Sequence, residues 1–450
     1  MDEDRKTKLK NQGAERLADA LLELARRDDA ASDMVERLTA LPEENVRGFK
    51  LGLAGLKRSR RFIDWRESRE FARRLDGLLD DLEAGVKDPW TGVELIGKFF
   101  EADGSVFGRC DDSNGMVGDV FRMHARALFV DYAQQCEDKE KIADLIIELN
   151  RRDDYGVRGI LSDCSVECLP EPLVRDMVRR LRKAADHEHD EYARRHHYLQ
   201  IESLARQLKD GKLLEETWLA DHKELPTFAL IDIARTCLES GDARTALDRL
   251  NRIPATETFQ VHEREELLVK IYRQMDEKDK LAELLFRRFR FNPSLERLDQ
   301  FLDVAGLDKR EKVTAEVVDK ILTGNVFRVG HVEFLIELGR MDDAEAYLLK
   351  QSDRLNGDLY YSLLPLAKMM GSADRPLAAS VVYRSLMISI LERKFYKAYG
   401  HAARYLRKLD KLSEGINEWR EFPDHESFKR ELIRVHGRKT SFWSKYENSK

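Results

Sequence analysis

The sequence contains little proline and glycine, few cysteines and no long hydrophobic run. Only 10 prolines and 25 glycines interrupt 450 residues, so few positions break a helix. The longest apolar segment, residues 377–391, carries one charge and is shorter than the roughly 18 to 20 residues that a membrane-spanning helix needs. The five cysteines are an odd number scattered over a large chain, which indicates reduced thiols. We therefore expect a cytoplasmic protein that does not enter a membrane.

Strong charge of one sign is also missing. The 78 basic and 84 acidic side chains leave a formal net charge of −6, which argues against a dedicated nucleic-acid binder and against a polybasic membrane-surface protein. The chain has no glycine-rich phosphate loop, no Gly-x-Ser-x-Gly elbow and no dinucleotide-binding fingerprint. The sequence therefore predicts no cofactor, and it favours a protein that is not an enzyme.

The residues that are abundant favour helices. Leu, Ala, Glu, Arg and Lys dominate the chain, and these residues lose little conformational freedom in a helix. Residues 14–25, AERLADALLELA, place Leu17, Leu21 and Leu24 on one face, as in an amphipathic helix. We find no convincing alternation of apolar and polar residues that would predict strands. The fold class is therefore all-α.

Two segments in the second half of the chain have the same spacing of small and apolar residues. ESGDARTALDRL (239–250) and ELGRMDDAEAYLL (337–349) share a glycine, an alanine five residues later and a leucine four residues after that. This spacing resembles the tetratricopeptide-type helical hairpin. We predict a helical-repeat (TPR-like) α-solenoid at residues 211–450, ending in C-terminal capping helices, and a less regular helical domain at residues 1–210.

Four segments, residues 62–83, 110–124, 382–412 and 423–443, carry a wider resemblance. Over most of its length the chain resembles an uncharacterised family of bacterial, largely helical proteins known only as a domain of unknown function. The resemblance implies a soluble bacterial protein and assigns no activity to any residue. Where that family often has Asp-Asp-Ser-Asp-Gly, residues 111–115 are Asp-Asp-Ser-Asn-Gly, which is one carboxylate fewer.

The loop at residues 101–124 is a candidate metal site. Four of its aspartates and one histidine could hold Mg²⁺ or Mn²⁺: Asp103, Asp111, Asp112, Asp119 and His124. The spacing does not fit an EF-hand, because the first and twelfth ligand positions are Cys110 and Phe121. The alternative is a turn at Asn114-Gly115 in which the carboxylates cap a helix.

A second ligand set combines Cys164 and Cys168 with His187 and His189. Thiolate and imidazole ligands suit zinc, but neither the cysteine pair nor the histidine pair has a common zinc spacing. Buried thiols and a solvated polar helix explain the same residues.

Basic residues form two candidate anion or nucleic-acid sites. Arg287, Arg288 and Arg290 alternate with three phenylalanines at residues 286–291, and such interleaving can track a phosphate backbone and stack on bases. The alternative is a solvated helix face beside a buried phenylalanine stripe. His436, Arg438 and Lys439 form the other set, for which the alternative is a helix end whose basic residues complement the helix dipole.

Three functions remain open after these observations. The leading one is a scaffold whose stacked hairpins hold a partner protein or peptide. The second is a metal-dependent enzyme or a metal-stabilised protein that uses Asp111, Asp112, Asp119 and His124. The third is nucleic-acid binding through the basic segments, which the balanced charge disfavours. The sequence does not predict an oligomeric state.

Overall fold

The computed structural model describes residues 2–151 and 153–447 and is built from helices. Among these residues the extent of β-type pairing is one isolated bridge between Ile63 and Cys110. The all-α prediction is confirmed. None of the described helices combines the length and the apolar character that crossing a membrane requires.

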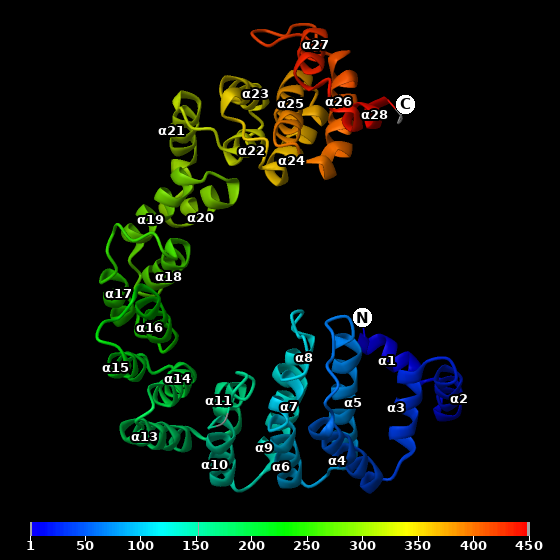
Figure 1. The fold of residues 1–450 in the computed structure, drawn as a ribbon. Coiled ribbons are helices and arrows are strands. Elements are labelled where there is room, and N and C mark those ends of the chain that lie inside the picture. The colour runs from blue at the N-terminus through cyan, green and yellow to red at the C-terminus, as the bar shows by residue number, and fades with distance from the viewer. Residues whose placement is uncertain (1, 152, 448–450) are drawn as a thin grey trace. The chain divides into compact units, whose positions relative to one another are not determined.

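The chain divides into two compact units, residues 1–261 and residues 262–450. Figure 1 shows both as successions of helices in chain order. The predicted domain boundary at residue 210 stays a prediction. The helices of the first unit are α1 (Asp2–Lys10), α2 (Ala14–Ala25), α3 (Asp29–Thr39), α4 (Pro42–Arg58), α5 (Ser68–Gly85), α6 (Pro89–Phe100), α7 (Asp103–Phe107), α8 (Met116–Asp119), the π-helix η1 (Val120–Ala125), α9 (Arg126–Gln135), α10 (Lys139–Asn150), α11 (Gly159–Asp163), α12 (Ser165–Cys168), α13 (Glu171–His187), α14 (Glu191–Gln207), α15 (Gly211–Asp221), α16 (Thr227–Glu239) and α17 (Ala243–Asn251).

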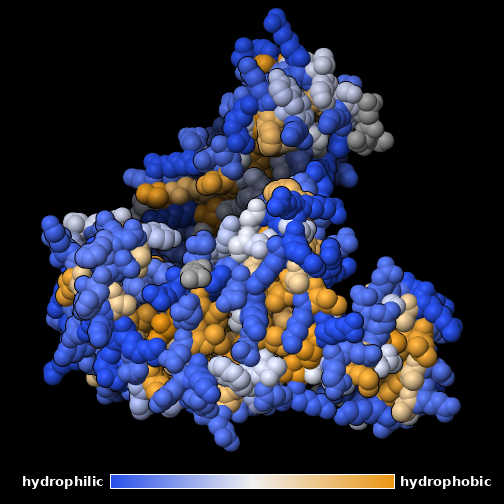
Figure 2. Space-filling view, turned by 60° about the horizontal axis from the view of Figure 1, so that its bottom comes forward, coloured by the Kyte–Doolittle hydropathy of each residue, from blue (hydrophilic) through white to orange (hydrophobic). Residues whose placement is uncertain are grey.

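The helices from residue 261 onward are α18 (Val261–Gln274), α19 (Lys278–Phe291), α20 (Leu295–Ala305), η2 (Leu307–Lys309), α21 (Arg310–Thr323), α22 (Val329–Glu337), α23 (Met341–Lys350), η3 (Ser352–Arg354), α24 (Tyr360–Ser372), α25 (Pro376–Glu392), η4 (Tyr396–Ala398), α26 (Tyr399–Ser413), α27 (His425–His436) and α28 (Thr440–Glu447). Hydrophilic side chains cover much of the face seen in Figure 2, and apolar side chains show between them. The many charged residues of the chain therefore lie mainly on the solvated faces of the helices.

Six successive hairpins, from α14–α15 to α24–α25, have a residue with positive φ between their helices. At five of these turns the next residue donates its N–H to a carbonyl five residues back, as in the bond of 2.8 Å from Arg340 to Leu335. This bond closes the helix end in a Schellman motif. The six residues lie 30 to 35 positions apart and are Lys209, Gly241, Asp276, Gly306, Gly339 and Asp374. The predicted helical-repeat solenoid is confirmed, whereas its likeness to the tetratricopeptide motif stays a prediction.

The alanine that lies five residues after Gly241, and the one five residues after Gly339, pack at helix contacts. Ala246 on α17 and Ala344 on α23 are both fully buried, and these helices pack on α16 and α22 of the same hairpins. A larger side chain has no room at either position.

We therefore expect Ala246→Leu and Ala344→Leu to lower the free energy of unfolding by about 1 to 3 kcal/mol each, because overpacking forces the helices apart. Urea unfolding followed by circular dichroism measures the loss. Ala346→Leu is a matched control on α23, since Ala346 is exposed. An equal loss at Ala346 would contradict the packing argument.

The apolar helix α25 lies between α24 and α26 and is buried along most of its length. Its single charged residue before the C-terminal turn, Arg384, is buried with its guanidinium between the rings of Trp419 and Phe428, at 4.6 and 4.3 Å from their centroids. Arg384 donates a hydrogen bond of 2.8 Å to the carbonyl of Pro423. Burial lowers the pKa of this guanidinium to about 10. Arg384 thus connects α25 to the segment that follows α26 and to α27.

Candidate binding pocket

The carboxylates of the acidic loop cap helices and pair locally. Asp112 accepts hydrogen bonds from the backbone N–H groups of Val117 and Gly118, at 2.9 and 2.8 Å, and so caps the short helix α8. Asp119 is exposed and pairs with an arginine one turn later, at 3.5 Å. Asp111 accepts a hydrogen bond from a backbone N–H two residues later in the loop. These contacts match the alternative of a capped turn.

His124 lies on the π-helix η1 and faces carboxylates of α5. Its Nδ1 is 3.1 Å from Asp76 Oδ1, and its Nε2 is 3.8 Å from Asp80 Oδ1. The hydrogen bond with Asp76 raises the pKa of His124 against the effect of burial. Ligand atoms of Asp80, Glu83 and His124 lie within 4.8 Å of one another, which makes one possible metal group among the described residues. The predicted set of Asp111, Asp112, Asp119 and His124 is not such a group and stays a prediction.

Three more of the candidate ligands, Asp103, Cys164 and Cys168, are buried in the protein interior. Asp103 is buried and forms two hydrogen bonds with the guanidinium of Arg158, at 2.9 and 2.6 Å. Cys164 and Cys168 are buried, and a hydrogen bond between them, followed by burial, raises the pKa of the Cys164 thiol. Within the part of the chain that the structure describes, neither pair belongs to a group that could hold a metal.

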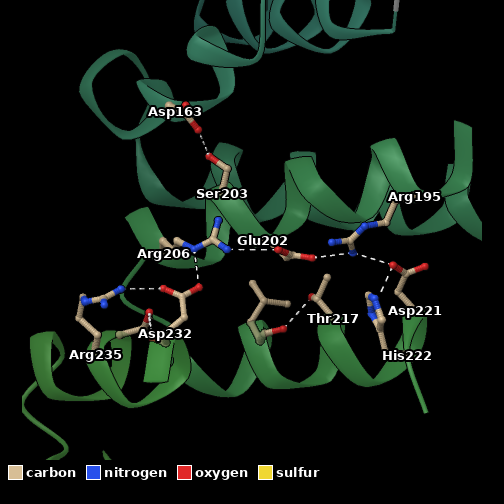
Figure 3. A network of polar contacts seen from close by, with 12 residues as sticks. Asp163, Arg195, Glu202, Ser203, Arg206, Thr217, Asp221, His222, Asp232 and Arg235 are labelled. Carbon is tan, nitrogen blue, oxygen red and sulfur yellow. Dashed lines mark hydrogen bonds and ion pairs between the residues drawn. The ribbon is translucent and has the colours of Figure 1, made fainter. Parts of the chain in front are cut away.

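A charged network that the sequence analysis missed joins α14 to α15 and α16 (Figure 3). At its centre the side chain of Glu202 is 2% exposed and accepts hydrogen bonds from Arg195 and Arg206, at 2.9 and 3.2 Å. Arg195 also pairs with Asp221 on α15, at 2.6 Å, and Arg206 pairs with Asp232 on α16, at 2.8 Å. The network ties one hairpin to the next. The signal in the sequence was the spacing of these residues along one helix, seven positions from Arg195 to Glu202 and four from Glu202 to Arg206.

A pocket of about 680 Å³ lies between α19, α21 and the start of α22. The helices contribute residues at helical spacing, so that one face of each helix points toward the pocket. The lining residues, which together define the basic–aromatic pocket, are Glu283, Phe286, Arg287, Arg290, Phe291, Val317, Lys320, Ile321, Gly324, Asn325, Val326, Arg328 and His331.

Positive charge exceeds negative charge in the basic–aromatic pocket. Of the described residues that line it, four are Lys or Arg, whereas Glu283 is the single carboxylate. Arg287 and Arg290 have carboxylate neighbours on other helices, at 3.3 and 3.5 Å. Among the described residues Lys320 and Arg328 have no such neighbour. An anionic group would therefore find two cations that are not yet neutralised.

The apolar part of the pocket is exposed to solvent. Phe291 is 68% exposed and Val326 is 59% exposed. The guanidinium of Arg328 lies 4.5 Å from the ring centroid of Phe291, and that of Arg290 lies 5.5 Å from that of Phe286. These cation–π contacts hold both guanidinium groups beside apolar surface. The pocket thus offers charge and apolar contact together.

The hydroxyl of Tyr347 fixes the segment that carries Val326 and Arg328. It donates to the carbonyl of Val326, at 2.7 Å, and accepts from the backbone N–H of Arg328, at 3.1 Å. His331 Nδ1 lies 2.8 Å from the same hydroxyl. Burial, with smaller contributions from Arg328 and Lys320, lowers the pKa of His331 to about 4. The imidazole is therefore neutral at pH 7, when the cations of the pocket are charged.

This shift predicts a pH dependence of stability. The folded pKa of about 4 lies below the ordinary value of 6.5, so the contribution of His331 is complete above pH 6.5 and is lost as the pH falls toward 4. His331→Asn keeps a donor near Tyr347 and removes the titration. We expect the free energy of unfolding of the variant, measured in urea, to fall less than that of the native chain between these pH values. Parallel profiles for the two proteins would contradict this assignment.

The sequence-predicted arginine trio is divided between two surfaces. Arg287 and Arg290 line the basic–aromatic pocket, as described, whereas Arg288 does not. The side chain of Arg288 is mostly buried and forms ion pairs with Glu265 and Glu266. The sequence could not distinguish Arg288 from Arg287 and Arg290, because local spacing does not show which neighbouring helix packs on which face of α19.

The C-terminal basic set lies at the junction of α27 and α28. The backbone carbonyl of His436 accepts a hydrogen bond of 3.1 Å from Trp443 Nε1 and one of 3.0 Å from the backbone N–H of Lys439. Burial, followed by the charge of Lys439, lowers the pKa of His436. These contacts close a helix end, and anion binding by His436, Arg438 and Lys439 stays a prediction.

Comparisons with known proteins give a family and little else. Residues 5–445 match the model of a family described as "Family of unknown function (DUF6880)". None of the curated proteins matches. A solved structure described as "Circular tandem repeat protein with novel repeat topology and enhanced subunit contact surfaces" is 17% identical, over 95% of this chain and 92% of that chain, with a TM-score of 0.12. A score this low supports no shared fold, so the architecture rests on the helices described above.

Proposed function

We propose, from the premise that this chain belongs to the DUF6880 family of unknown function, that it is a scaffold whose basic–aromatic pocket binds an acidic, apolar segment of a partner protein. The observation that carries the proposal is a pair of cations, Lys320 and Arg328, that have no carboxylate neighbour in the described part of the chain and lie beside the exposed side chains of Phe291 and Val326. A carboxylate that forms a charge-assisted hydrogen bond with Arg328 brings an apolar neighbour against these two residues.

The volume and the setting of the pocket suit a peptide. About 680 Å³ lies within the range of pockets that bind small ligands and holds a few side chains of a bound segment. Stacked helical hairpins are a common frame for such segments, because successive helices present a continuous surface. The aromatic and arginine side chains of the pocket are the residue types that dominate binding energy at interfaces.

Single-stranded nucleic acid is the second candidate for the same pocket, because arginine and phenylalanine side chains alternate along α19. Bases bind such surfaces by stacking on exposed rings. In this pocket one face of Phe291 is covered by the guanidinium of Arg328 and one face of Phe286 by that of Arg290. Fewer ring faces remain for bases, and the geometry favours the peptide.

The proposal also places the scaffold in the cytoplasm. All five cysteines are free, and four of them are buried, which fits a reducing compartment. The proposal assigns no reaction and no cofactor to the chain.

Fluorescence anisotropy with a labelled peptide in which Asp and Glu alternate with Leu and Phe tests the pocket. We expect the full chain to bind this peptide and Lys320→Glu to weaken the binding about tenfold, because an attractive charge becomes a repulsive one. Lys312→Glu is the matched control: Lys312 is exposed on the same helix and lies outside the pocket. Equal losses in the two variants would contradict the assignment of the site.

A labelled oligothymidine measured beside the peptide decides between the two candidates. Tighter binding of the oligonucleotide, with an affinity that falls steeply with salt concentration and that Lys320→Glu reduces, would reject the peptide and assign the pocket to nucleic acid.

A further inference from the structure

A second pocket, of about 850 Å³, lies in the first unit between α10, α13 and α14. Among the residues that the structure describes, five carboxylates line it and outnumber its two arginines, Arg151 and Arg180. Each arginine pairs with a carboxylate of the same pocket: Arg180 with Asp144, at 2.7 Å, and Arg151 with Glu148, at 3.7 Å. Three carboxylates therefore remain without a cation among the described residues.

These three carboxylates differ in what they contact. Asp153 accepts three backbone hydrogen bonds, at 2.9 to 3.1 Å. Glu188 accepts one backbone hydrogen bond, at 3.1 Å. Asp154 is exposed, and no hydrogen bond or ion pair of its side chain is present among the described residues. The pocket therefore holds negative charge that the protein itself stabilises only in part.

Buried atoms at the pocket also lack hydrogen-bond partners. Gln200 lines it, is 5% exposed, and its buried Oε1 has no partner among the residues that the structure describes. The buried Nδ1 of His197 has none among them either, and burial, followed by the charge of His196, lowers the pKa of His197. Buried amide oxygens are nearly always hydrogen-bonded in proteins. The unpaired oxygen of Gln200 can thus accept a hydrogen bond from a bound ligand.

The other two histidines that line the pocket each contact a backbone carbonyl through one ring nitrogen. His196 Nε2 donates to the carbonyl of Asn150, at 2.6 Å, and His187 Nδ1 donates to the carbonyl of Lys183, at 2.7 Å. Since a carbonyl only accepts, the bonded nitrogen of each ring carries a hydrogen. Tyr192, which is 80% exposed, adds an aromatic face of the kind that attracts organic cations.

We propose that the pocket between α10, α13 and α14 binds an organic cation with N–H donors, a primary amine or a guanidinium. The cation donates a hydrogen bond to Gln200 Oε1, and Asp153, Asp154 and Glu188 offset its charge. Two sources have this chemistry: a free diamine or guanidine, and a Lys or Arg side chain of a partner protein. This site lies in the other unit from the basic–aromatic pocket and does not depend on that pocket's function.

Isothermal titration calorimetry of the full chain at low salt tests the proposal with three probes. These are agmatine, a short blocked peptide with one arginine, and the same peptide with citrulline, whose side chain has a similar shape without the charge. We expect agmatine or the arginine peptide to bind, and the citrulline peptide to bind at least about tenfold more weakly than the arginine peptide. Tighter binding of agmatine identifies a free cation as the ligand, and tighter binding of the arginine peptide identifies a partner side chain. Failure of both cations to bind the folded chain would overturn the proposal, as would equal binding of the citrulline and arginine peptides.

Two variants locate the binding. Gln200→Leu removes the unpaired acceptor, so we expect cation binding to weaken about tenfold while the urea midpoint stays equal or rises. Asp154→Asn should also weaken binding, whereas Asp186→Asn, an exposed control on α13 outside the pocket, should not. Unchanged binding in both Gln200→Leu and Asp154→Asn would show that the cation binds elsewhere.

Discussion

Arg158→Met should lower the free energy of unfolding by about 3 to 5 kcal/mol, because it leaves the carboxylate of Asp103 buried without its cation. Both side chains of this pair are at least nine-tenths buried, so water cannot replace the guanidinium. The two hydrogen bonds between them join α7 to the segment before α11. Urea unfolding of the variant measures the loss.

The double variant Asp103→Leu/Arg158→Met is the control for this prediction. Replacing both members of a buried ion pair with apolar residues is often close to neutral. We therefore expect the double variant to recover most of the stability that the single variant loses. A double variant as unstable as Arg158→Met would show that lost packing, and not the unpaired carboxylate, causes the effect.

Phe442→Ala should lower the free energy of unfolding by about 3 to 5 kcal/mol, the range for removing a fully buried phenylalanine ring. Phe442 on α28 is fully buried, and its ring centroid lies 6.3 Å from that of Tyr399 on α26 and 4.9 Å from that of Trp443. The ring therefore holds the last helix on the repeat stack. Phe395→Ala is the control, because Phe395 is half exposed, and a loss of similar size there would refute the argument.

The sequence predicted the helical class and part of the repeat. The turns at Gly241 and Gly339 could be recognised from the sequence, because glycine is the residue that most readily adopts positive φ at a helix end. Lys209 and Asp374 adopt the same conformation, but the sequence does not mark these positions as turns, since neither residue type prefers positive φ as glycine does. Their turns therefore could not be recognised from residue type alone.

The candidate sites could be predicted only where one helix supplies them. Arg287 and Arg290 were recognised because they lie on α19 within a short basic segment. Lys320 and Arg328 were missed, because they come from α21 and from the segment before α22. The partners of His124 are likewise on α5, more than forty positions earlier in the chain. Contacts between distant segments follow from packing, and a single sequence gives no direct signal for them.

The network around Glu202 bears on how unfolding spreads along the stack. In repeat proteins each hairpin is stabilised by its own packing and by its interface with its neighbours. Between α14, α15 and α16 part of that interface is ionic, and the arginine side chains in it are partly exposed. Salt screens exposed charges far more than it affects apolar contacts. At high ionic strength the hairpins on the two sides of this junction should therefore unfold more independently of each other. Salt concentration should thus change the cooperativity of unfolding more than it changes the total free energy of unfolding.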